Sequence, residues 1–224
     1  MLNDLPLFVS SIFILTAFVT VFLFYKASGN SKPVLLILGI WLLIQGMVGF
    51  SGFYTVTDTL PPRFSLLIGP PLILIILLFL TEKGRHFIDA LDLKKLTYLH
   101  TVRVPVELVL LWLYQSGYVP ELMTFEGRNF DVLSGITAPF IAYMGFSRKK
   151  LGKRTILIWN FICLALLLNI VINAILAAPF PFQKIAFDQP NIGVLYFPFI
   201  WLPACIVPLV LLSHLTAIRQ LLKR

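Results

Sequence analysis

The sequence predicts an all-α protein, a polytopic bundle of seven transmembrane helices. Of its 224 residues, 58% are hydrophobic and only 12% are charged, whereas a soluble domain carries about 25% charged residues. A water-soluble chain of this length has no way to bury so much apolar surface. The apolar residues also gather into seven runs, each near the roughly 20 residues that a membrane-spanning helix needs. We therefore expect residues 1–224 to form one integral membrane domain.

The amino-terminal half holds three of these runs. Residues 5–25 and 33–54 are apolar and uncharged, and each is long enough to span a membrane. Residues 65–81 form the third run, which the pair Pro70 and Pro71 interrupts. Proline removes a helical hydrogen bond, so we expect the third span to be locally broken.

Four further runs complete the bundle. The last of them is interrupted by Pro203 and Pro208, which makes it a second broken span. The connections between runs are short, and none can hold a soluble domain. The longest, EKGRHFIDALDLKK, fits either an amphipathic helix lying along the membrane interface or a polar loop. The four runs cover residues 96–117, 130–147, 155–177 and 194–217.

Basic residues predict the orientation of the bundle. Lys and Arg accumulate in cytoplasmic loops, and 14 of them fall on one side of the predicted membrane against 3 on the other. We therefore expect the amino terminus outside and the carboxyl terminus in the cytoplasm. The richer side carries Lys26, Lys32, Lys83, Arg85, Lys94, Lys95, Arg148, Lys149, Lys150, Lys153, Arg154, Arg219, Lys223 and Arg224, and the poorer side carries Arg63, Arg128 and Lys184.

This asymmetry accounts for the net charge of +8 without a nucleic-acid partner. The densest basic segment should attract anionic lipid headgroups at the cytoplasmic surface. Because the chain is compact and has no soluble domain, we expect it to lie in a plasma membrane, specifically a bacterial inner membrane. The basic segment contains Arg148, Lys149, Lys150, Lys153 and Arg154.

The fourth span carries the polar groups that point most strongly to function. On a helix that advances about 100° per residue, His100, Arg103, Glu107 and Tyr114 fall on one stripe. Arg103 and Glu107 are one turn apart, which permits a direct ion pair. Charges are costly in hydrocarbon, so membrane proteins pair them or use them. The stripe therefore either locks this helix to its neighbours or lines a cavity that binds a ligand or moves protons.

His214 on the last span should lie at a depth similar to His100. A site with two histidines and Glu107 as metal ligands has poor spacing support, because the chain contains neither HxxxH nor HExxH. We therefore predict no metal and no cofactor. Ser213 beside His214 cannot act with it as a nucleophile and base, since adjacent helical residues point apart.

Further polar candidates lie towards the outer side. Asn169 and Asn173 are one turn apart on the sixth span, where interhelical hydrogen bonding is the simplest explanation. Gln45 lies near the centre of the second span. In the outer loop, Glu126 and Arg128 are available for an external ligand. Asn129 fits an N-cap of the fifth span. Asp131 would complement the dipole of that helix, and it also remains an outer-loop candidate.

Three hypotheses about function follow. The first is a small binding or transport protein with an intramembrane polar cavity lined by the fourth, sixth and seventh helices, together with the proline-broken third. The second is an intramembrane enzyme that uses Glu107 with His100 or His214 as acid and base on a lipid-like or quinone-like substrate. The third is a structural membrane subunit whose polar residues only fix packing. A pocket adjoining the polar stripe would favour a small-molecule ligand over the structural role.

Overall fold

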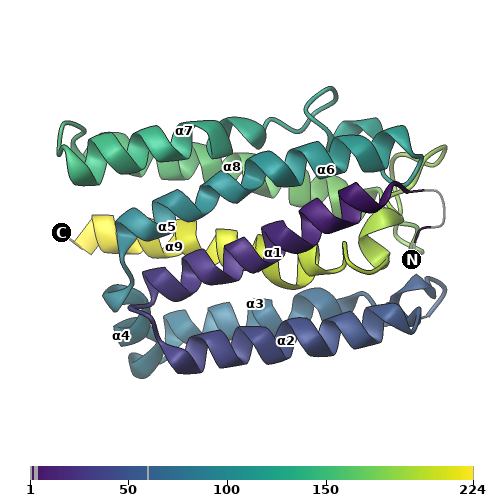
Figure 1. Ribbon diagram of the computed structural model, residues 1–224, viewed down its shortest axis with the longest axis horizontal. Coiled ribbons are helices and arrows are strands. Elements are labelled where there is room, and N and C mark those ends of the chain that lie inside the picture. Colours follow the sequence, from purple (N-terminus) through teal and green to yellow (C-terminus); the bar gives the residue numbers. More distant parts are fainter. Residues whose placement is uncertain (1, 3–4, 60, 224) are drawn as a thin grey trace.

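The computed structural model describes residue 2, residues 5–59 and residues 61–223, and this part of the chain is helical without strands (Figure 1). In the described residues nine α-helices follow one another, and the longer ones run back and forth along a common axis. Short 3-10 or π turns lie between or within them. The α-helices are α1 (Leu7–Ala27), α2 (Lys32–Phe50), α3 (Ser65–Leu80), α4 (Glu82–Ala90), α5 (Leu93–Leu99), α6 (Arg103–Gln115), α7 (Val132–Ala142), α8 (Lys153–Leu176) and α9 (Val207–Lys223).

Within the part of the chain that the structure describes, five helical segments are long and apolar enough to cross a membrane. They are α1, α2, the continuous stretch Leu93–Gln115, α8 and the stretch Leu202–Lys223. A sixth candidate is α3 with α4, which meet at an angle of 95°. The predicted fifth span is a shorter apolar helix, Val132–Ser147. The structure therefore supports an integral membrane protein, while seven spans and their orientation stay predictions.

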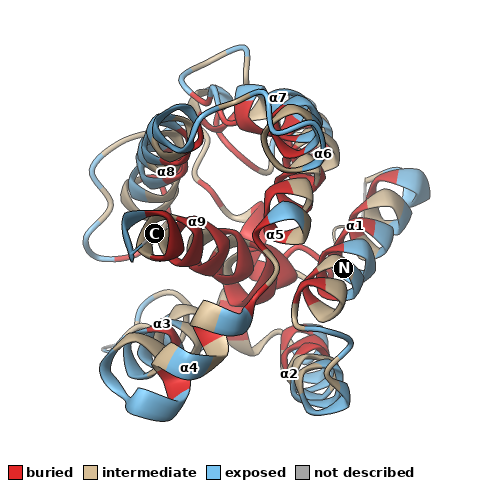
Figure 2. Cartoon of the chain, turned by 90° about the vertical axis from the view of Figure 1, so that its left-hand side faces the viewer, coloured by how far each residue is buried: buried red, intermediate tan, exposed pale blue. Residues whose placement is uncertain are grey.

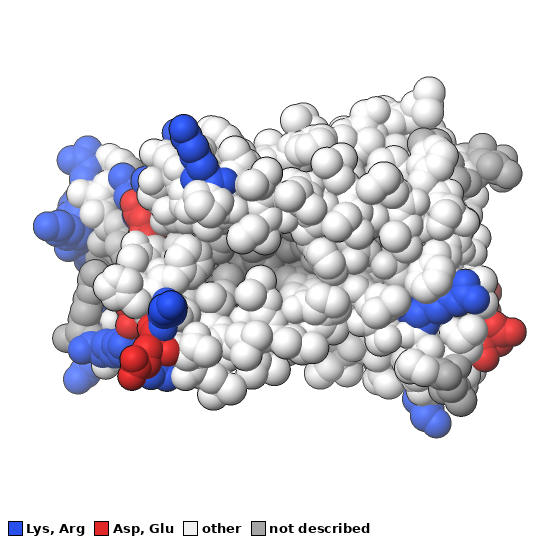
Figure 3. All heavy atoms as spheres, turned by 90° about the horizontal axis from the view of Figure 1, so that it is seen from below, with Lys and Arg blue, Asp and Glu red and all other residues white. Residues whose placement is uncertain are grey.

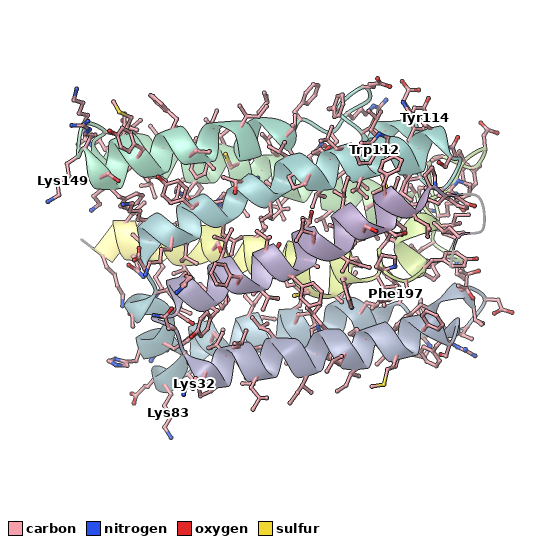
Figure 4. The ribbon with its side chains drawn as sticks, viewed as in Figure 1. Lys32, Lys83, Trp112, Tyr114, Lys149 and Phe197 are labelled. Atoms are coloured by element: carbon pink, nitrogen blue, oxygen red, sulfur yellow. The ribbon has the colours of Figure 1, made fainter. Side chains whose placement is uncertain are left out.

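The outer surface of the bundle matches a lipid environment. Large apolar side chains point outward along α2, where Leu36, Leu43 and Met47 are each about two-thirds exposed. Charged side chains gather at the two ends of the molecule, and uncharged atoms cover the middle (Figure 3). Lys32, Lys83 and Lys149 lie at one end and Tyr114 at the other (Figure 4). Arg224, one of the 14 basic residues on the richer side of the predicted membrane, lies outside the described residues.

Helix α9 forms the centre of the bundle. Buried residues cover most of its surface, and α5, α8, α3 and α4 all contact it (Figure 2). Its entry is a π turn, Leu202–Ile206, followed by Pro208. Because Pro208 has no N–H, it cannot bond the carbonyl of Ala204. The Trp41 indole donates to that carbonyl instead, at 2.8 Å, which fastens α2 to the central helix.

The segment after the third span contains an amphipathic helix rather than a polar loop. Thr81 caps α4 by accepting a hydrogen bond from the backbone of Gly84 at 3.1 Å. A Cβ at Gly84 would lie 2.5 Å from the backbone of Leu78, so this sharp bend requires glycine. The helix interpretation of residues 82–95 is therefore confirmed, although the helix ends at Ala90 and α5 begins at Leu93.

One cluster of charges fastens α4 to the end of α9. Asp89 accepts hydrogen bonds from Arg219 Nε at 2.9 Å and from Lys223 Nζ at 2.6 Å. These bonds, chiefly the one from Arg219, lower the pKa of the Asp89 carboxyl from 3.8 to about 2. The folded protein thus favours the ionised carboxylate, which stabilises the fold above the ordinary pKa of aspartate.

We expect Asp89→Asn to lower the thermal unfolding midpoint of the detergent-solubilised protein at neutral pH. The difference from wild type should shrink as the pH falls from about 4 to about 2, because protonation of Asp89 removes the same ion pairs. Thermal unfolding midpoints measured as a function of pH test this prediction. Asp58→Asn, a change at an exposed aspartate, serves as the control. A difference that stays constant down to pH 2 would contradict the assignment.

Candidate functional site

Pro105 shapes the chain just before the polar stripe. Because Pro105 lacks an N–H, the Thr101 carbonyl loses its usual partner in the α-helix. The chain tightens into a 3-10 turn, His100–Val102, and α6 begins at Arg103. His100 and Arg103 are only 1% and 3% exposed, so this turn presents both side chains to the bundle interior.

The Arg103 guanidinium connects four segments of the bundle. Its Nη1 donates to Asp131 Oδ1 at 2.8 Å, immediately before α7, and lies 3.4 Å from the carbonyl of Cys163 in α8. Its Nη2 lies 3.0 Å from His214 Nε2 in α9. Burial of a guanidinium is tolerable only when such partners replace water. Arg103 is therefore the point at which α6, α7, α8 and α9 are held together.

The partners of His214 fix the position of its proton. Arginine is always charged and can only donate, so His214 Nε2 must accept. The proton then lies on Nδ1, which donates to Asn160 Oδ1 at 2.9 Å. The Asn160 amide in turn donates to the Ile156 carbonyl at 2.9 Å. His100 stacks on His214 with ring centroids 3.9 Å apart, so the two histidines meet in the core.

A second branch runs from Asp131 to Glu107. The Asp131 N–H donates to Asn129 Oδ1 at 3.0 Å. The Asn129 amide donates to Glu107 Oε1 at 2.6 Å and to the Met123 carbonyl at 3.0 Å. Gly135 permits this arrangement, because a Cβ there would lie 3.0 Å from the Val104 backbone nitrogen and 2.8 Å from its side chain. The branch thus depends on close approach of α7 to α6.

Glu107 borders a cavity of about 170 Å³. Glu107 is 2% exposed, and its Oε2 is buried without a hydrogen-bond partner. Asn191 also borders the cavity, and its Oδ1 is likewise buried without a partner. The remaining walls are apolar apart from Asp131 and come from α3, α6, α8 and the entry to α9, with α3 and α8 on either side of α9 (Figure 2). The cavity therefore has mostly apolar walls, and two of the residues that border it each carry a buried oxygen without a donor.

A larger groove of about 340 Å³ lies between α2, α3 and α9. Its walls are apolar, and the one indole N–H that borders it, on Trp41, already bonds the Ala204 carbonyl. The face that α2 and α3 form is visibly hollowed near its middle (Figure 3). Nothing in this groove selects a polar ligand.

A family model described as a domain of unknown function, DUF8737, matches residues 56–222. This range covers more than half of the chain. The chain belongs to this family. No curated protein and no solved structure matches it. The DUF8737 range contains Arg103, Glu107, Asp131 and His214, whereas α1 and α2 lie before it.

The spacing of Arg103 and Glu107 permits a direct ion pair, but each side chain bonds a third polar group instead. Arg103 pairs with Asp131, and Glu107 accepts from Asn129. Helical spacing shows that two side chains share a face, but tertiary packing decides their partners. Asn129, expected as an N-cap, accepts from the Asp131 N–H at 3.0 Å. Asp131 lies at the N-cap of α7, where a carboxylate complements the helix dipole, although its side chain makes no cap bond. Both side chains also serve the buried network.

The other sequence candidates lie elsewhere. Tyr114 and Arg128 border an outer pocket of about 550 Å³, separate from the cavity at Glu107 (Figure 4). Asn169 donates to the Arg128 carbonyl at 2.9 Å, and Asn173 donates to Asn169 at 3.3 Å. Gln45 accepts from the Tyr54 hydroxyl at 2.6 Å. Finally, Glu126 is exposed in the outer loop.

Sequence reasoning missed Asn160 and Asn191. Asn160 stands alone in an apolar run, without the one-turn partner that drew attention to Asn169 and Asn173. Its isolation in hydrocarbon was the usable signal, because polar residues within spans are seldom without a role. Asn191 lies in an irregular segment, where no periodic pattern indicates direction. Among the described residues, no group of three His, Cys, Asp or Glu side chains could hold a metal ion.

We expect Arg103→Met and Asp131→Leu each to destabilise the protein strongly, by about 3–5 kcal/mol, because each leaves a buried charge unpaired. The double variant should lose much less than the sum of the two. Denaturation in mixed micelles measures this coupling. The same cycle on Asp89 and Arg219, which are partly exposed, should give a smaller value. Additive losses at Arg103 and Asp131 would contradict their pairing.

Proposed function

We propose that this protein is a small intramembrane binding or transport protein whose ligand occupies the cavity at Glu107. The observation that carries the proposal is the unpartnered Oε2 of Glu107, a residue that borders a mostly apolar cavity. A purely structural carboxyl would be satisfied on both oxygens, since buried polar groups are normally paired. An available oxygen next to open space is instead suited to a ligand.

The shape of the site supports a ligand that arrives from the membrane. Leu72 of α3 and Leu168 of α8 border the cavity and are 37% and 45% exposed at the outer surface of the bundle. No soluble vestibule is needed for such a route, because an amphiphile can enter between helices from hydrocarbon. The walls of the cavity come from α3, α6, α8 and the entry to α9. Of the eight residues predicted to bind substrate, Glu107 is the one that borders it.

The two alternative functions have less support. In the proposed enzyme, Glu107 would act with His100 or His214, but neither histidine borders the cavity. His214 is held by Arg103 and Asn160, and His100 is stacked against it. If the protein were only a structural subunit, helix packing would explain the Arg103 network. It would not explain why Glu107 Oε2 has no partner.

We further propose the topology and surroundings that the basic residues indicate. The bundle would span a plasma membrane seven times, with its carboxyl terminus in the cytoplasm. The segment from residue 147 to residue 154 would contact anionic headgroups. Its basic side chains are all exposed, which suits such contact. They belong to Arg148, Lys149, Lys150, Lys153 and Arg154.

We expect Ala174→Phe to abolish ligand binding, because Ala174 borders the cavity and a phenyl ring would fill it. Benzyl alcohol is a suitable probe, since a cavity of about 150 Å³ can hold benzene. Ligand-observed NMR on protein in lipid nanodiscs should detect binding to wild type and not to Ala174→Phe.

The matched control is Ala165→Phe, which adds the same ring to an exposed position of the same helix. This variant should bind the probe as wild type does. Equal signals from all three proteins would mean that the probe reports only partition into lipid and that the cavity takes no ligand.

A further inference from the structure

The buried charges around the cavity do not balance if both carboxyls are ionised. Arg103 is the one buried cation in the network, and it pairs with Asp131. Glu107 has only the neutral Asn129 amide as its hydrogen-bond partner. An ionised Glu107 would therefore leave one negative charge uncompensated among mostly apolar side chains, and such a charge is costly.

A proton on Glu107 removes this charge imbalance. The hydrogen bonds of Glu107 show which carboxyl oxygen carries the proton. Oε1 accepts from Asn129, so the proton occupies Oε2, the oxygen without a partner, on a residue that borders the cavity. The proton is thus held on the side chain that a ligand in the cavity would contact. A cationic group arriving there could take its place without changing the charge of the site.

We propose that the cavity binds a protonated amine with an apolar body and that binding releases the proton of Glu107. This inference rests on the proposed function and names its ligand class. The ammonium N–H groups would donate to Glu107 Oε2 and Asn191 Oδ1, both of which lack a donor. One positive charge enters as ammonium and one leaves as a proton to water. No covalent bond is made or broken except the O–H bond of Glu107.

The remaining walls favour an amine over other headgroups. The polar residues that border the cavity are Glu107, Asp131 and Asn191, and none of them is cationic. A carboxylate ligand would meet like charges, and a neutral alcohol could not replace the proton. The volume of about 170 Å³ accepts a group near the size of benzene. A longer apolar body could extend past Leu72 and Leu168 towards the lipid.

The other titratable groups near Glu107 are engaged with partners of their own. Asp131, before α7, and Arg103, on α6, compensate each other. Cys163 on α8 contributes its carbonyl to Arg103. His214 on α9 is neutral because its Nε2 accepts from Arg103, and His100 stacks against it. Glu107 is therefore the group in this set whose proton a cation can displace.

Binding of benzylamine, benzyl alcohol and benzoate to the protein in phosphatidylcholine nanodiscs tests the proposal. We expect benzylamine to bind at least tenfold more tightly than the other two at neutral pH. Its affinity should rise up to tenfold per pH unit between about pH 5 and 8, because one proton is released. Benzyl alcohol should bind with no such dependence. Nanodiscs containing phosphatidylethanolamine show whether a lipid amine competes for the site, which distinguishes a lipid-borne amine from a free one.

Glu107→Gln should remove the preference for benzylamine and its pH dependence while benzyl alcohol still binds. The exposed Glu126→Gln should behave as wild type. If benzyl alcohol and benzylamine bind equally and without pH dependence, the amine inference is wrong and the binding function stands. If no probe binds more to wild type than to Ala174→Phe, the binding function itself fails.

Discussion

The buried charge of Arg103 is the constraint on which the rest of the structure depends. A guanidinium that is 3% exposed within an apolar bundle is stable only if its donors find acceptors. Those acceptors come from α9, from α8 and from the residue that precedes α7. The positions of three segments are thereby tied to one side chain. Because Arg103 is balanced by Asp131, Glu107 is left without a cation.

Breaks in regular helix create the site. Pro105 and the 3-10 turn before it aim His100 and Arg103 inward, and the π turn Leu202–Ile206 supplies part of the cavity wall. Irregular helical turns of this kind often occur at functional sites. The carbonyl that Pro208 leaves free is used by Trp41, so the break also anchors α2. Pro208 therefore serves both packing and cavity formation, since it also borders the cavity.

The helices could be read from the sequence because lipid imposes a simple rule, namely a long apolar run for each span. Most predicted runs match the long helices, but the run at 194–217 corresponds to the helical stretch Leu202–Lys223. The break expected in the third span is also wrong, because α3 continues through Pro70 and Pro71 and the chain instead turns sharply into α4. The hydrogen-bond partners within the site could not be predicted from the sequence in the same way. One-turn spacing placed Arg103 near Glu107, whereas the actual partner, Asp131, is brought in by the approach of α7 at Gly135. Asn160 and Asn191 gave no periodic signal, since their roles arise only when distant segments meet.

Glu107 should hold a proton in the ligand-free protein, and carbon-13 NMR of glutamate side-chain carboxyls can detect it. The chain has four glutamates, and Glu82, Glu121 and Glu126 are exposed. Loss of one signal in Glu107→Gln assigns the buried carboxyl. We expect this signal to be that of an undissociated acid at neutral pH. An ionised Glu107 in the ligand-free protein would mean that the buried charges are not balanced in this way.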